Sequence, residues 1–419
     1  MWESFSELKE YAKSFNIELK NGDLSYLHKD LTVEGKRIPN RLLVQPVEGT
    51  DAAGDGAIGE LTRRRYLRYA NGGAGTVWME ATALNGDVRS SERQLVLSEK
   101  TLYSFSKLIE EMKENAVKRN GYAPVIIIQI THPGRNCLDP KPASDSSIWE
   151  SIKNSKGRKS LSDEEIERLT EEYKKVARLA ERAGFDGVEI KACHRVFINE
   201  LLSARNREGR YGGSFENRTR HLKEAAAAAR SVTKEILIAV RLSYYDGIPF
   251  PDGFGMSEDK GVMQNSSEPL RLISELKSEF GVELINCTSN NPVFELFKCT
   301  DSKSRLFEEP VNAIINGTRM HQFAAEIKEI LPEIKVVATM FSHLKQHAAH
   351  LGAGIIERGE ADLIGFGRQA LAYPDFARDI LIKGEMDPSK ACVYCSGCNK
   401  LLGTQKGVGC IVFDKIYKE

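Results

Sequence analysis

Four chemically versatile side chains follow one short apolar segment near the middle of the chain. Residues 185–190 (FDGVEI) are mostly apolar or β-branched, which indicates a short buried strand. Lys191, Cys193, His194 and Arg195 come directly after it. Because such side chains at the carboxyl end of a strand are typical of functional sites, this segment is the first candidate for catalysis.

Four of the eight cysteines crowd the end of the chain. Cys392, Cys395 and Cys398 are each separated by two residues, and eleven residues precede Cys410. Three thiolates can therefore converge from one tight loop while a fourth closes the site. Four thiolates suit either zinc or an iron–sulfur cluster, and spacing alone does not separate the two. In a cytosolic chain, this crowding favours metal over disulfides.

Three further polar positions suit a planar, anionic ligand. Gln129 ends one expected strand, Arg241 lies within another, and the segment GFGR (365–368) ends the last. Glycines expose backbone N–H groups that bind phosphate, an adjacent helix start adds positive potential, and Arg368 would complete the charge match. The alternatives are a satisfied polar layer inside a barrel for Gln129 and Arg241, and a simple turn for GFGR.

The elements that must position these residues alternate between short strands and helices. Apolar runs bounded by turn residues predict eight strands, each followed by a helix. The expected strands are 42–45, 76–79, 124–130, 185–190, 236–242, 282–285, 335–338 and 362–364. Eight such repeats predict a (β/α)8 TIM barrel, in the α/β class, better than an open doubly wound sheet.

The chain is expected to have three parts. These are an N-terminal arm (1–30), the barrel (31–385) and a short C-terminal cysteine-rich extension (386–419). Two connections, 134–160 and 286–316, are too long for turns, and both leave strand carboxyl ends where they could cover a substrate. The alternative for each is a disordered surface insertion.

Composition limits the partners. The 59 basic residues balance 59 acidic ones, which gives no electrostatic footprint for nucleic acid or an anionic membrane surface. No run of eighteen apolar residues predicts a membrane-spanning helix, and the amino terminus lacks the apolar core of a signal peptide. We therefore expect a cytoplasmic protein that binds small molecules or proteins, and a homo-oligomer is compatible with this sequence.

Six motifs, taken in order, resemble the Old Yellow Enzyme family of flavin-dependent oxidoreductases. They are NRLLVQP, WMEAT, QITHPGR, INELLS with NREGRYGGSFENR, AVRLS and ADLIGFGRQALAYPDF, and the resemblance spans about residues 30–412. The cysteine-rich end narrows it to the iron–sulfur branch of 2,4-dienoyl-CoA reductase, 2-enoate reductase and trimethylamine dehydrogenase.

The resemblance implies an FMN across the carboxyl mouth of the barrel. Gln129 would hydrogen-bond the pyrimidine edge of the flavin, and Arg241 would lie beside its N1 and O2 edge, where negative charge collects on reduction. Ala81 would be the close-approach position after the second strand. The residues that would contact the flavin ring after the first strand are Pro46, Val47 and Glu48. Those that would bind the phosphate are Met340, Phe341, Gly367 and Arg368.

The resemblance also implies a [4Fe–4S] cluster on Cys392, Cys395, Cys398 and Cys410, because that branch carries a similar cysteine run after its eighth helix. Structural zinc remains the alternative. Relatives continue into a second half that binds FAD and NAD(P)H, whereas no GxGxxG fingerprint follows a strand here. Electrons are therefore expected either from NAD(P)H directly or from a separate redox protein or subunit through the cluster. The presence of a cluster slightly favours the protein donor.

The expected activity is ene reduction. Hydride would pass from reduced FMN to the C=C bond of an enone, enoate or enoyl thioester, while Lys191 and His194 activate the carbonyl oxygen. The family has His or Asn at these two positions and a tyrosine proton donor at the position of Val196, which cannot donate a proton. Tyr244, Tyr245 or the connection 286–316 could supply a replacement.

Several alternatives stay open at this point. The chain could instead be an amine dehydrogenase or demethylase-type flavoenzyme, a non-catalytic electron-transfer subunit, or a flavin-free barrel lyase or isomerase with a zinc knuckle. Lys191 could instead form a salt bridge, and His194 a structural hydrogen bond. Cys193 is expected to serve as a small packing residue.

Overall fold

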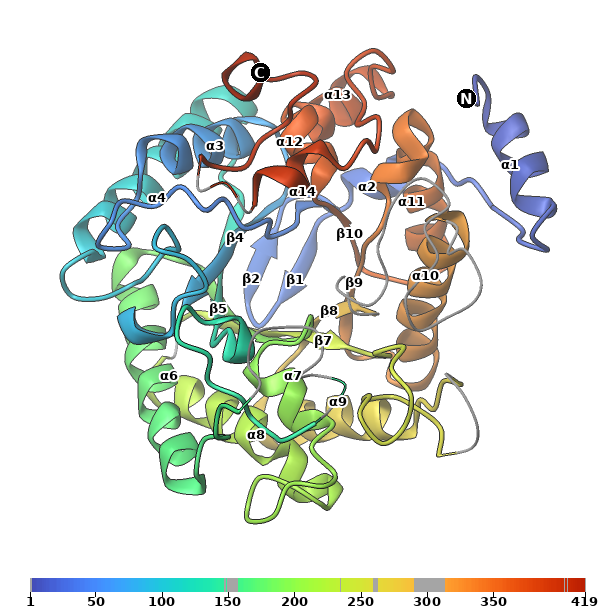
Figure 1. The fold of residues 1–419 in the computed structure, drawn as a ribbon. Coiled ribbons are helices and arrows are strands. Elements are labelled where there is room, and N and C mark those ends of the chain that lie inside the picture. Colours follow the sequence, from blue (N-terminus) through green and yellow to red (C-terminus); the bar gives the residue numbers. More distant parts are fainter. Residues whose placement is uncertain are drawn as a thin grey trace.

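A closed parallel barrel forms the centre of the molecule. The structure is a computed structural model that describes residues 2–146, 148, 157–233, 235–258, 263–289, 313–402, 404 and 406–418. Eight strands pair in the order β10-β3-β4-β5-β6-β7-β8-β9, and helices surround them (Figure 1). The predicted (β/α)8 TIM barrel is confirmed.

Each barrel strand overlaps a segment that the sequence predicts as a strand. Nearly every residue of these strands is buried, because one face points into the barrel and the other packs on helices. The strands are β3 (Leu42–Val44), β4 (Thr76–Ala83), β5 (Val125–Thr131), β6 (Gly187–Ala192), β7 (Leu237–Ser243), β8 (Leu284–Thr288), β9 (Lys335–Ala338) and β10 (Leu363–Phe366).

The helices form an outer ring and a set of short turns at the mouth. The ring contains α3 (Glu60–Asn71), α4 (Leu102–Asn120), α6 (Asp163–Ala183), α8 (Phe215–Val232), α9 (Ser267–Phe280), α10 (Ala313–Ile330), α11 (Ala348–Glu357) and α13 (Phe376–Lys383). Shorter helices are α1 (Phe5–Lys13), α2 (Ser25–His28), α7 (Phe197–Leu202), α12 (Arg368–Ala372) and α14 (Gly397–Leu401), with 3-10 turns η1 (Gly86–Val88), η2 (Gly134–Asn136), η3 (Ser342–His347) and η4 (Lys415–Tyr417). In the part of the chain that the structure describes, no helix has both the length and the apolar character needed to cross a membrane.

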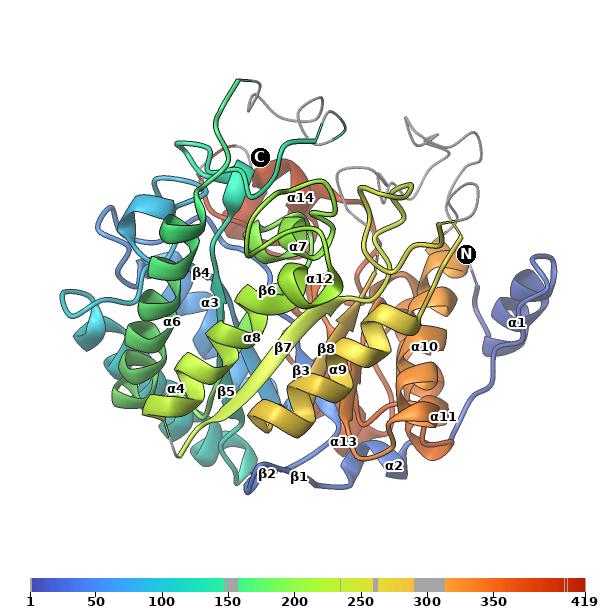
Figure 2. The same cartoon turned by 90° about the horizontal axis from the view of Figure 1, so that it is seen from below.

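A small hairpin that the sequence did not reveal closes the amino-terminal end of the barrel. Its strands β1 (Leu31–Val33) and β2 (Lys36–Ile38) pair antiparallel, and Figure 2 shows them below the barrel. The side chains of Leu31, Val33 and Ile38 belong to the same apolar cluster as the inward-facing residues of the barrel strands. This apolar plug leaves the opposite end, where the strands finish, as the only mouth of the described barrel.

Part of the first long connection expected to cover the mouth (134–160) and most of the second (286–316) fall outside the described residues, which exclude 147, 149–156 and 290–312. The described part of the first connection contains η2, and residues 157–162 lead into α6. Ser162 caps that helix in a reciprocal capping box with Glu165.

Ion pairs and a backbone hydrogen bond hold the cysteine-rich end of the chain against the barrel. Asp414 accepts hydrogen bonds from both Nη atoms of Arg64 at 2.8 and 3.1 Å and from Arg68 at 2.5 Å, both on α3. The backbone N–H of Val408 donates to the carbonyl of Gly49 at 2.8 Å, in the loop after β3. The tail is therefore held against one side of the barrel mouth.

Replacing Asp414 with Asn should loosen this tail. The substitution removes the negative charge of a side chain that is 6% exposed and leaves two arginines without their counter-ion. We therefore expect the free energy of unfolding to fall by about 2 kcal/mol, which lies between the values typical of exposed and buried pairs. Denaturant unfolding measures the loss, and limited proteolysis should cut the tail faster.

Asp387→Asn is the matched control in the same segment. Asp387 pairs with Lys390 at 3.0 Å, but the two side chains are 32% and 51% exposed, so this change should have a smaller effect on unfolding than the change at Asp414. Equal stability of the two variants would show that the Asp414 pair does not hold the tail.

Candidate functional site

A hydrogen-bonded polar layer crosses the inside of the barrel below its mouth. The carboxyl group of Glu189 on β6 accepts from Gln129 Nε2 at 2.5 Å and from Asn286 Nδ2 at 2.9 Å. Asn286 also exchanges two hydrogen bonds with Gln45, at 2.9 and 3.0 Å. Glu189 is fully buried, and this burial raises its pKa to about 7, against the opposing charge of Arg241.

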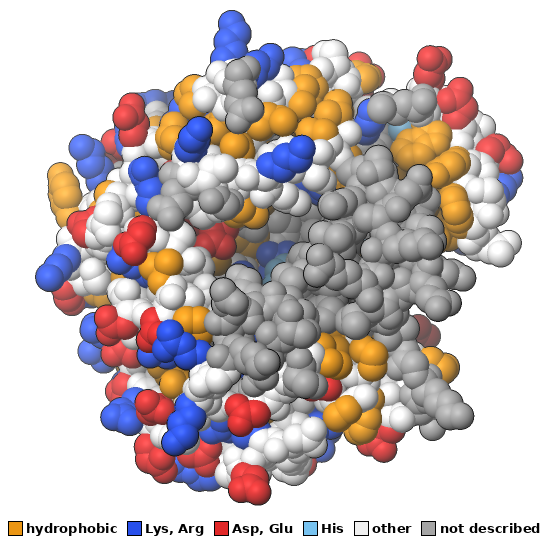
Figure 3. All heavy atoms as spheres, in the orientation of Figure 1, with side chains coloured by type: hydrophobic (Ala, Val, Ile, Leu, Met, Phe, Trp, Pro, Cys, Tyr) orange, Lys and Arg blue, Asp and Glu red, His pale blue; other side chains and the backbone are white. Residues whose placement is uncertain are grey.

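Two cations lie just above this layer. Lys191 follows Glu189 by two residues, so both point into the barrel, and Lys191 is the register partner of Arg241 on β7. Arg241 is 9% exposed, and its Nε atom has no hydrogen-bond partner among the described residues. Figure 3 shows Lys or Arg and His side chains at the floor of a hollow in this face. The mouth is therefore cationic.

His194 occupies a strained turn immediately after β6. Both His194 and Arg195 have left-handed backbone conformations, with φ of 58° and 62°, which are costly for residues other than glycine and are found most often at functional sites. His194 Nε2 lies 3.3 Å from the Thr288 hydroxyl at the end of β8. Burial, with Arg241 and Lys191 nearby, lowers the pKa of His194 well below its ordinary value, so the ring is neutral.

Cys193 is buried and its ordinary role is packing. Burial raises the pKa of its thiol to about 11, so it stays protonated at neutral pH. The structure thus places Lys191 and His194 at the mouth, whereas Cys193 and the buried Arg195 lie behind it. Lys191 forms no ion pair with any carboxylate of the described chain, and the hydrogen bond expected as the alternative for His194 is present.

The loop after β3 and the end of β4 lie beside one another at the mouth. A register shift between Met79 and Ala81 lets Ala81 pair with Gln129, while Glu80 between them binds Arg65 at 2.6 Å outside the barrel. Ala81 therefore stands next to Gln129, as the resemblance implies for a close-approach position.

The expected ring-contacting segment, Pro46, Val47 and Glu48, follows β3 directly. The Glu48 carboxylate accepts from the Ser90 hydroxyl at 2.6 Å. A Cβ atom on Gly367 would lie 3.4 Å from Val47, so the loops after β3 and β10 are in contact.

The expected phosphate residues lie at the ends of β9 and β10, but their side chains have different surroundings. Phe341 is fully buried, and its ring stacks on His321 at 4.3 Å, so only its backbone can serve a ligand. The Arg368 guanidinium lies 3.7 Å from the ring centre of Tyr394, and the Tyr394 hydroxyl contacts Met340 Sδ at 3.9 Å. Arg368 is therefore shared between this end of the mouth and the cysteine-rich tail.

Four cysteines from the tail line one cavity with Arg368. These are Cys392, Cys395, Cys398 and Cys410. Backbone N–H groups of Tyr394 and Phe413 donate to the sulfur atoms of Cys392 and Cys410, each at 3.4 Å. No group of three or more His, Cys, Asp or Glu side chains within the described ranges is arranged to hold a metal ion.

The two tyrosines considered as proton donors lie near the same ring of α10. Tyr244 continues the outward side of β7, and its ring packs 5.2 Å from Phe323, while the Tyr245 ring lies 5.9 Å from Phe323. The outward position of Tyr244 does not support a role as the replacement for a tyrosine at Val196. The third candidate, the connection after β8, lies mostly outside the described residues.

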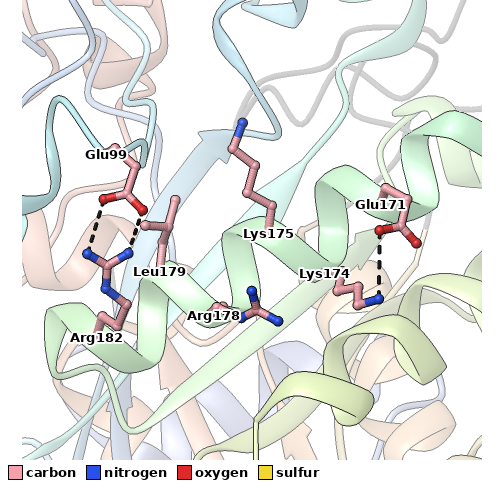
Figure 4. A pocket seen from close by; sticks show the side chains of 7 residues that line it. All are labelled: Glu99, Glu171, Lys174, Lys175, Arg178, Leu179 and Arg182. Carbon is pink, nitrogen blue, oxygen red and sulfur yellow. Dashed lines mark hydrogen bonds and ion pairs between the residues drawn. The ribbon is translucent and has the colours of Figure 1, made fainter.

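A separate groove lies on the outer surface along α6. Its lining includes Lys174, Lys175, Arg178 and Arg182, and Figure 4 shows pairs between Arg182 and Glu99 and between Lys174 and Glu171. The groove is on the side of the barrel rather than at the strand ends. We assign it no role in catalysis.

Sequence reasoning missed Glu189, Asn286, Gln45 and Thr288, which complete the polar layer and contact His194. One signal was available, because Glu189 and Asn286 are polar residues inside otherwise apolar strands, VEI and LIN. Such residues are rarely buried without partners, so each could have been used to predict a hydrogen-bond network inside the barrel.

Comparison with known proteins gives a family and a fold. A family model described as the NADH:flavin oxidoreductase / NADH oxidase family matches residues 26–292. The NADPH dehydrogenase of Clostridium acetobutylicum is 34% identical over 224 residues, which make up 52% of this chain and 64% of that protein. The NADPH dehydrogenase of Bacillus subtilis is 29% identical over 358 residues, or 84% of this chain and 93% of that one.

A solved complex of 2-naphthoyl-CoA reductase with 2-naphthoyl-CoA has a similar fold. The TM-score is 0.75 with 18% sequence identity, and the match covers 94% of this chain but 58% of the other. This chain therefore corresponds to little more than half of that protein, and the likeness concerns the fold alone.

Replacing Glu189 with Gln should change how stability depends on pH. The folded protein holds a proton on Glu189 up to about pH 7, whereas the unfolded chain loses it near the ordinary value of 4.5. The stability that follows from this difference is complete below about pH 4.5 and is lost as the pH rises to about 7, with a slope of up to about 1.4 kcal/mol per pH unit.

The Glu189→Gln variant cannot titrate there, so its unfolding free energy should fall less than that of the wild type between pH 5 and 8. Denaturant unfolding at several pH values measures both. Glu171→Gln, which alters a carboxylate that is 74% exposed, is the control and should keep the wild-type slope. Parallel curves for wild type and Glu189→Gln would contradict the prediction.

Proposed function

The chain belongs to the NADH:flavin oxidoreductase / NADH oxidase family, and we propose that it is an FMN-dependent ene-reductase with a [4Fe–4S] cluster in its tail. The observation that carries the proposal is the cationic mouth above the Glu189 layer. In particular, Arg241 is almost buried and its Nε atom lacks a partner among the described residues. A buried unpaired donor is costly, so this one fits a bound acceptor.

The residues around the mouth fit a flavin. Gln129 uses one N–H of its amide for Glu189, which leaves its other N–H and its carbonyl oxygen for the pyrimidine edge. Arg241 would bind the N1 and O2 edge, and Ala81 would leave room for the ring. Pro46, Val47 and Glu48, with backbone groups of Met340, Phe341 and Gly367 and the Arg368 side chain, would hold the remaining edges and the phosphate. The flavin supplies hydride chemistry when bound.

The cysteine cavity has the donor set that an iron–sulfur cluster needs. In a [4Fe–4S] cluster each of four thiolates binds a different iron, so the sulfur atoms surround a volume. The support for the cluster is that four cysteines line one cavity, since no group in the described ranges is already arranged to hold a metal ion. The N–H groups that donate to Cys392 and Cys410 would stabilise thiolate charge.

Lys191 and His194 are the residues that would act on the substrate. A carbonyl oxygen placed between them would accept a charged hydrogen bond from the lysine, and the neutral imidazole would orient it. Negative charge that develops on this oxygen would then face an ammonium group. The proton for the α-carbon is assigned to water, since no tyrosine of the described residues stands at the mouth in the family's position.

Electrons for the reaction would come from NAD(P)H or, through the cluster, from a separate redox protein. Anaerobic purification should yield a yellow-brown protein with about one FMN and about four iron atoms per chain. Reduced protein should then be reoxidised by members of a panel of enones, enoates and enoyl thioesters, followed by flavin absorbance. Bleaching of the oxidised protein by amines would instead support the dehydrogenase alternative, and absence of flavin would refute the proposal.

Arg241→Gln should weaken FMN binding by about 1.5–3 kcal/mol, or roughly tenfold to a hundredfold, because it removes a charged hydrogen bond. The measurement is the dissociation constant of FMN from fluorescence titration of the flavin-free protein. Arg178→Gln in the α6 groove is the control and should bind FMN normally. Wild-type affinity in Arg241→Gln would remove Arg241 from the flavin site.

A further inference from the structure

A second pocket, away from the mouth, contains an unpaired cation. The pocket has a volume of about 190 Å³ and lies between α13 and the segments that lead into β3 and β5. Figure 2 shows α2 and α13 at this amino-terminal end of the barrel. The lining residues that matter here are Pro39, Asn40, Tyr122, Arg378, Leu381 and Ile382. We infer that this pocket binds a small carboxylate with an apolar body, and that Arg378 holds its charge.

The Arg378 guanidinium has no partner within the described residues. Its Nε atom is buried and donates no hydrogen bond, and no described carboxylate forms an ion pair with it. The two acidic residues nearest in sequence are engaged elsewhere, since Asp375 pairs with Arg119 and Asp379 with Lys383, each at 3.0 Å. A half-buried cation without a counter-ion is unfavourable, so an anion is the ligand that this pocket lacks.

Other arginines in the interior of the protein differ from Arg378 in this respect. Arg65 also has an Nε atom without a partner, but its Nη2 atom binds the carboxylate of Asp51 at 2.9 Å. Arg207 shows the same pattern, with its Nη2 atom 2.9 Å from the Asp163 carboxylate. In both cases a carboxylate compensates the charge. The structure describes no such carboxylate for Arg378.

The polar floor of the pocket is already hydrogen-bonded. The Nδ2 atom of Asn40 donates to the Gly73 carbonyl and to the Tyr122 hydroxyl, both at 3.0 Å, and its Oδ1 atom accepts from the Gly75 N–H at 2.9 Å. The Tyr122 hydroxyl itself donates to the Gly73 carbonyl at 2.6 Å. Because these donors are occupied, an anion in the pocket would be bound by Arg378 rather than by this floor.

The remaining lining favours an organic carboxylate over free phosphate. One guanidinium binds one carboxylate through two parallel hydrogen bonds and balances its single charge. Leu381 packs partly against the core, and Ile382 is 65% exposed beside it, so they offer an apolar wall to the body of the ligand. Pockets for drug-sized ligands have roughly 300–1,000 Å³, so this smaller one suits a small molecule. Free phosphate would leave the apolar wall unmatched.

Benzoate and benzamide test the inference because they have nearly the same shape but differ in charge. We expect the purified protein to bind benzoate at least about tenfold more tightly than benzamide in calorimetric titrations, the size typical of a charged hydrogen bond. Benzoate should also bind more tightly than inorganic phosphate. The preference for benzoate over benzamide should vanish in Arg378→Gln, whereas Arg178→Gln on α6 should behave as wild type.

A second variant tests the site from its exposed rim. Ile382→Asp places a carboxylate beside the pocket on a side chain that solvent already reaches, so the fold should tolerate it. Repulsion should weaken benzoate binding several-fold and leave benzamide binding unchanged. Ile330→Asp at the end of α10, where the side chain is 53% exposed, is the matched control. If Arg378→Gln fails to fold, wild-type benzoate affinity in Ile382→Asp would overturn the inference.

Hydrogen exchange locates the bound ligand, because the mouth is also cationic. Benzoate should slow exchange in residues 118–124 and 376–383, where the pocket lies, and these changes should be absent in Arg378→Gln. Protection confined to the mouth, equal affinity for benzoate and benzamide, tighter binding of phosphate, or an unchanged preference in Arg378→Gln would each overturn the inference. None of these outcomes depends on whether the protein reduces alkenes, so the proposed function stands or falls separately.

Discussion

The burial of one carboxyl group in the middle of a closed barrel organises the mouth of this protein. Glu189 sits where solvent cannot hydrate it, so its oxygens must be satisfied by side chains from other strands inside the barrel. Gln129 and Asn286 provide that satisfaction from either side of β6. Because their amides are oriented by Glu189, the groups above them face the mouth in a fixed arrangement. A functional site built on strands in this way is more precise than one built on loops.

The apolar hairpin that closes the amino-terminal end of the barrel determines at which end the barrel interior can bind ligands. Leu31, Val33 and Ile38 fill the amino-terminal end, so polar side chains inside the barrel can meet ligands only at the carboxyl ends of the strands. Within the barrel, the character of the interior therefore changes from apolar at the hairpin to hydrogen-bonded at Glu189 and then to cationic at Lys191 and Arg241. That gradient places the positive charges of Lys191 and Arg241 at the carboxyl ends of the strands, which is where an anionic ligand would be attracted.

Sequence alone predicted the barrel because its strands are short apolar runs separated by strongly periodic helices. Strand β9 was predicted over the same residues that it occupies, 335–338, whereas the β1–β2 hairpin was missed because two three-residue strands carry too little periodicity. The sequence placed Lys191 and His194 after one strand, Gln129 at the end of another and Arg241 within a third. It could not show that Glu189 links Gln129 to Asn286, since partners from strands so distant in sequence meet only after the barrel closes. The outward position of Tyr244 was accessible from the sequence, because side chains alternate along a strand and Tyr244 lies three residues from the inward-pointing Arg241.

The cysteine cavity and the GFGR segment, which the sequence suggests as two separate sites, lie next to each other in the structure. The cysteine spacing and the GFGR segment were independent motifs, yet Arg368 lines the cysteine cavity and stacks on Tyr394, which lies between two of the cysteines in sequence. Tyr394 in turn reaches Met340 at the end of β9. A guanidinium in this position is close to thiol groups on one side and to the loops after β9 and β10 on the other. The cysteine cavity and this end of the mouth therefore share the charge of Arg368, although α12 and α13 separate Arg368 from Cys392 along the chain.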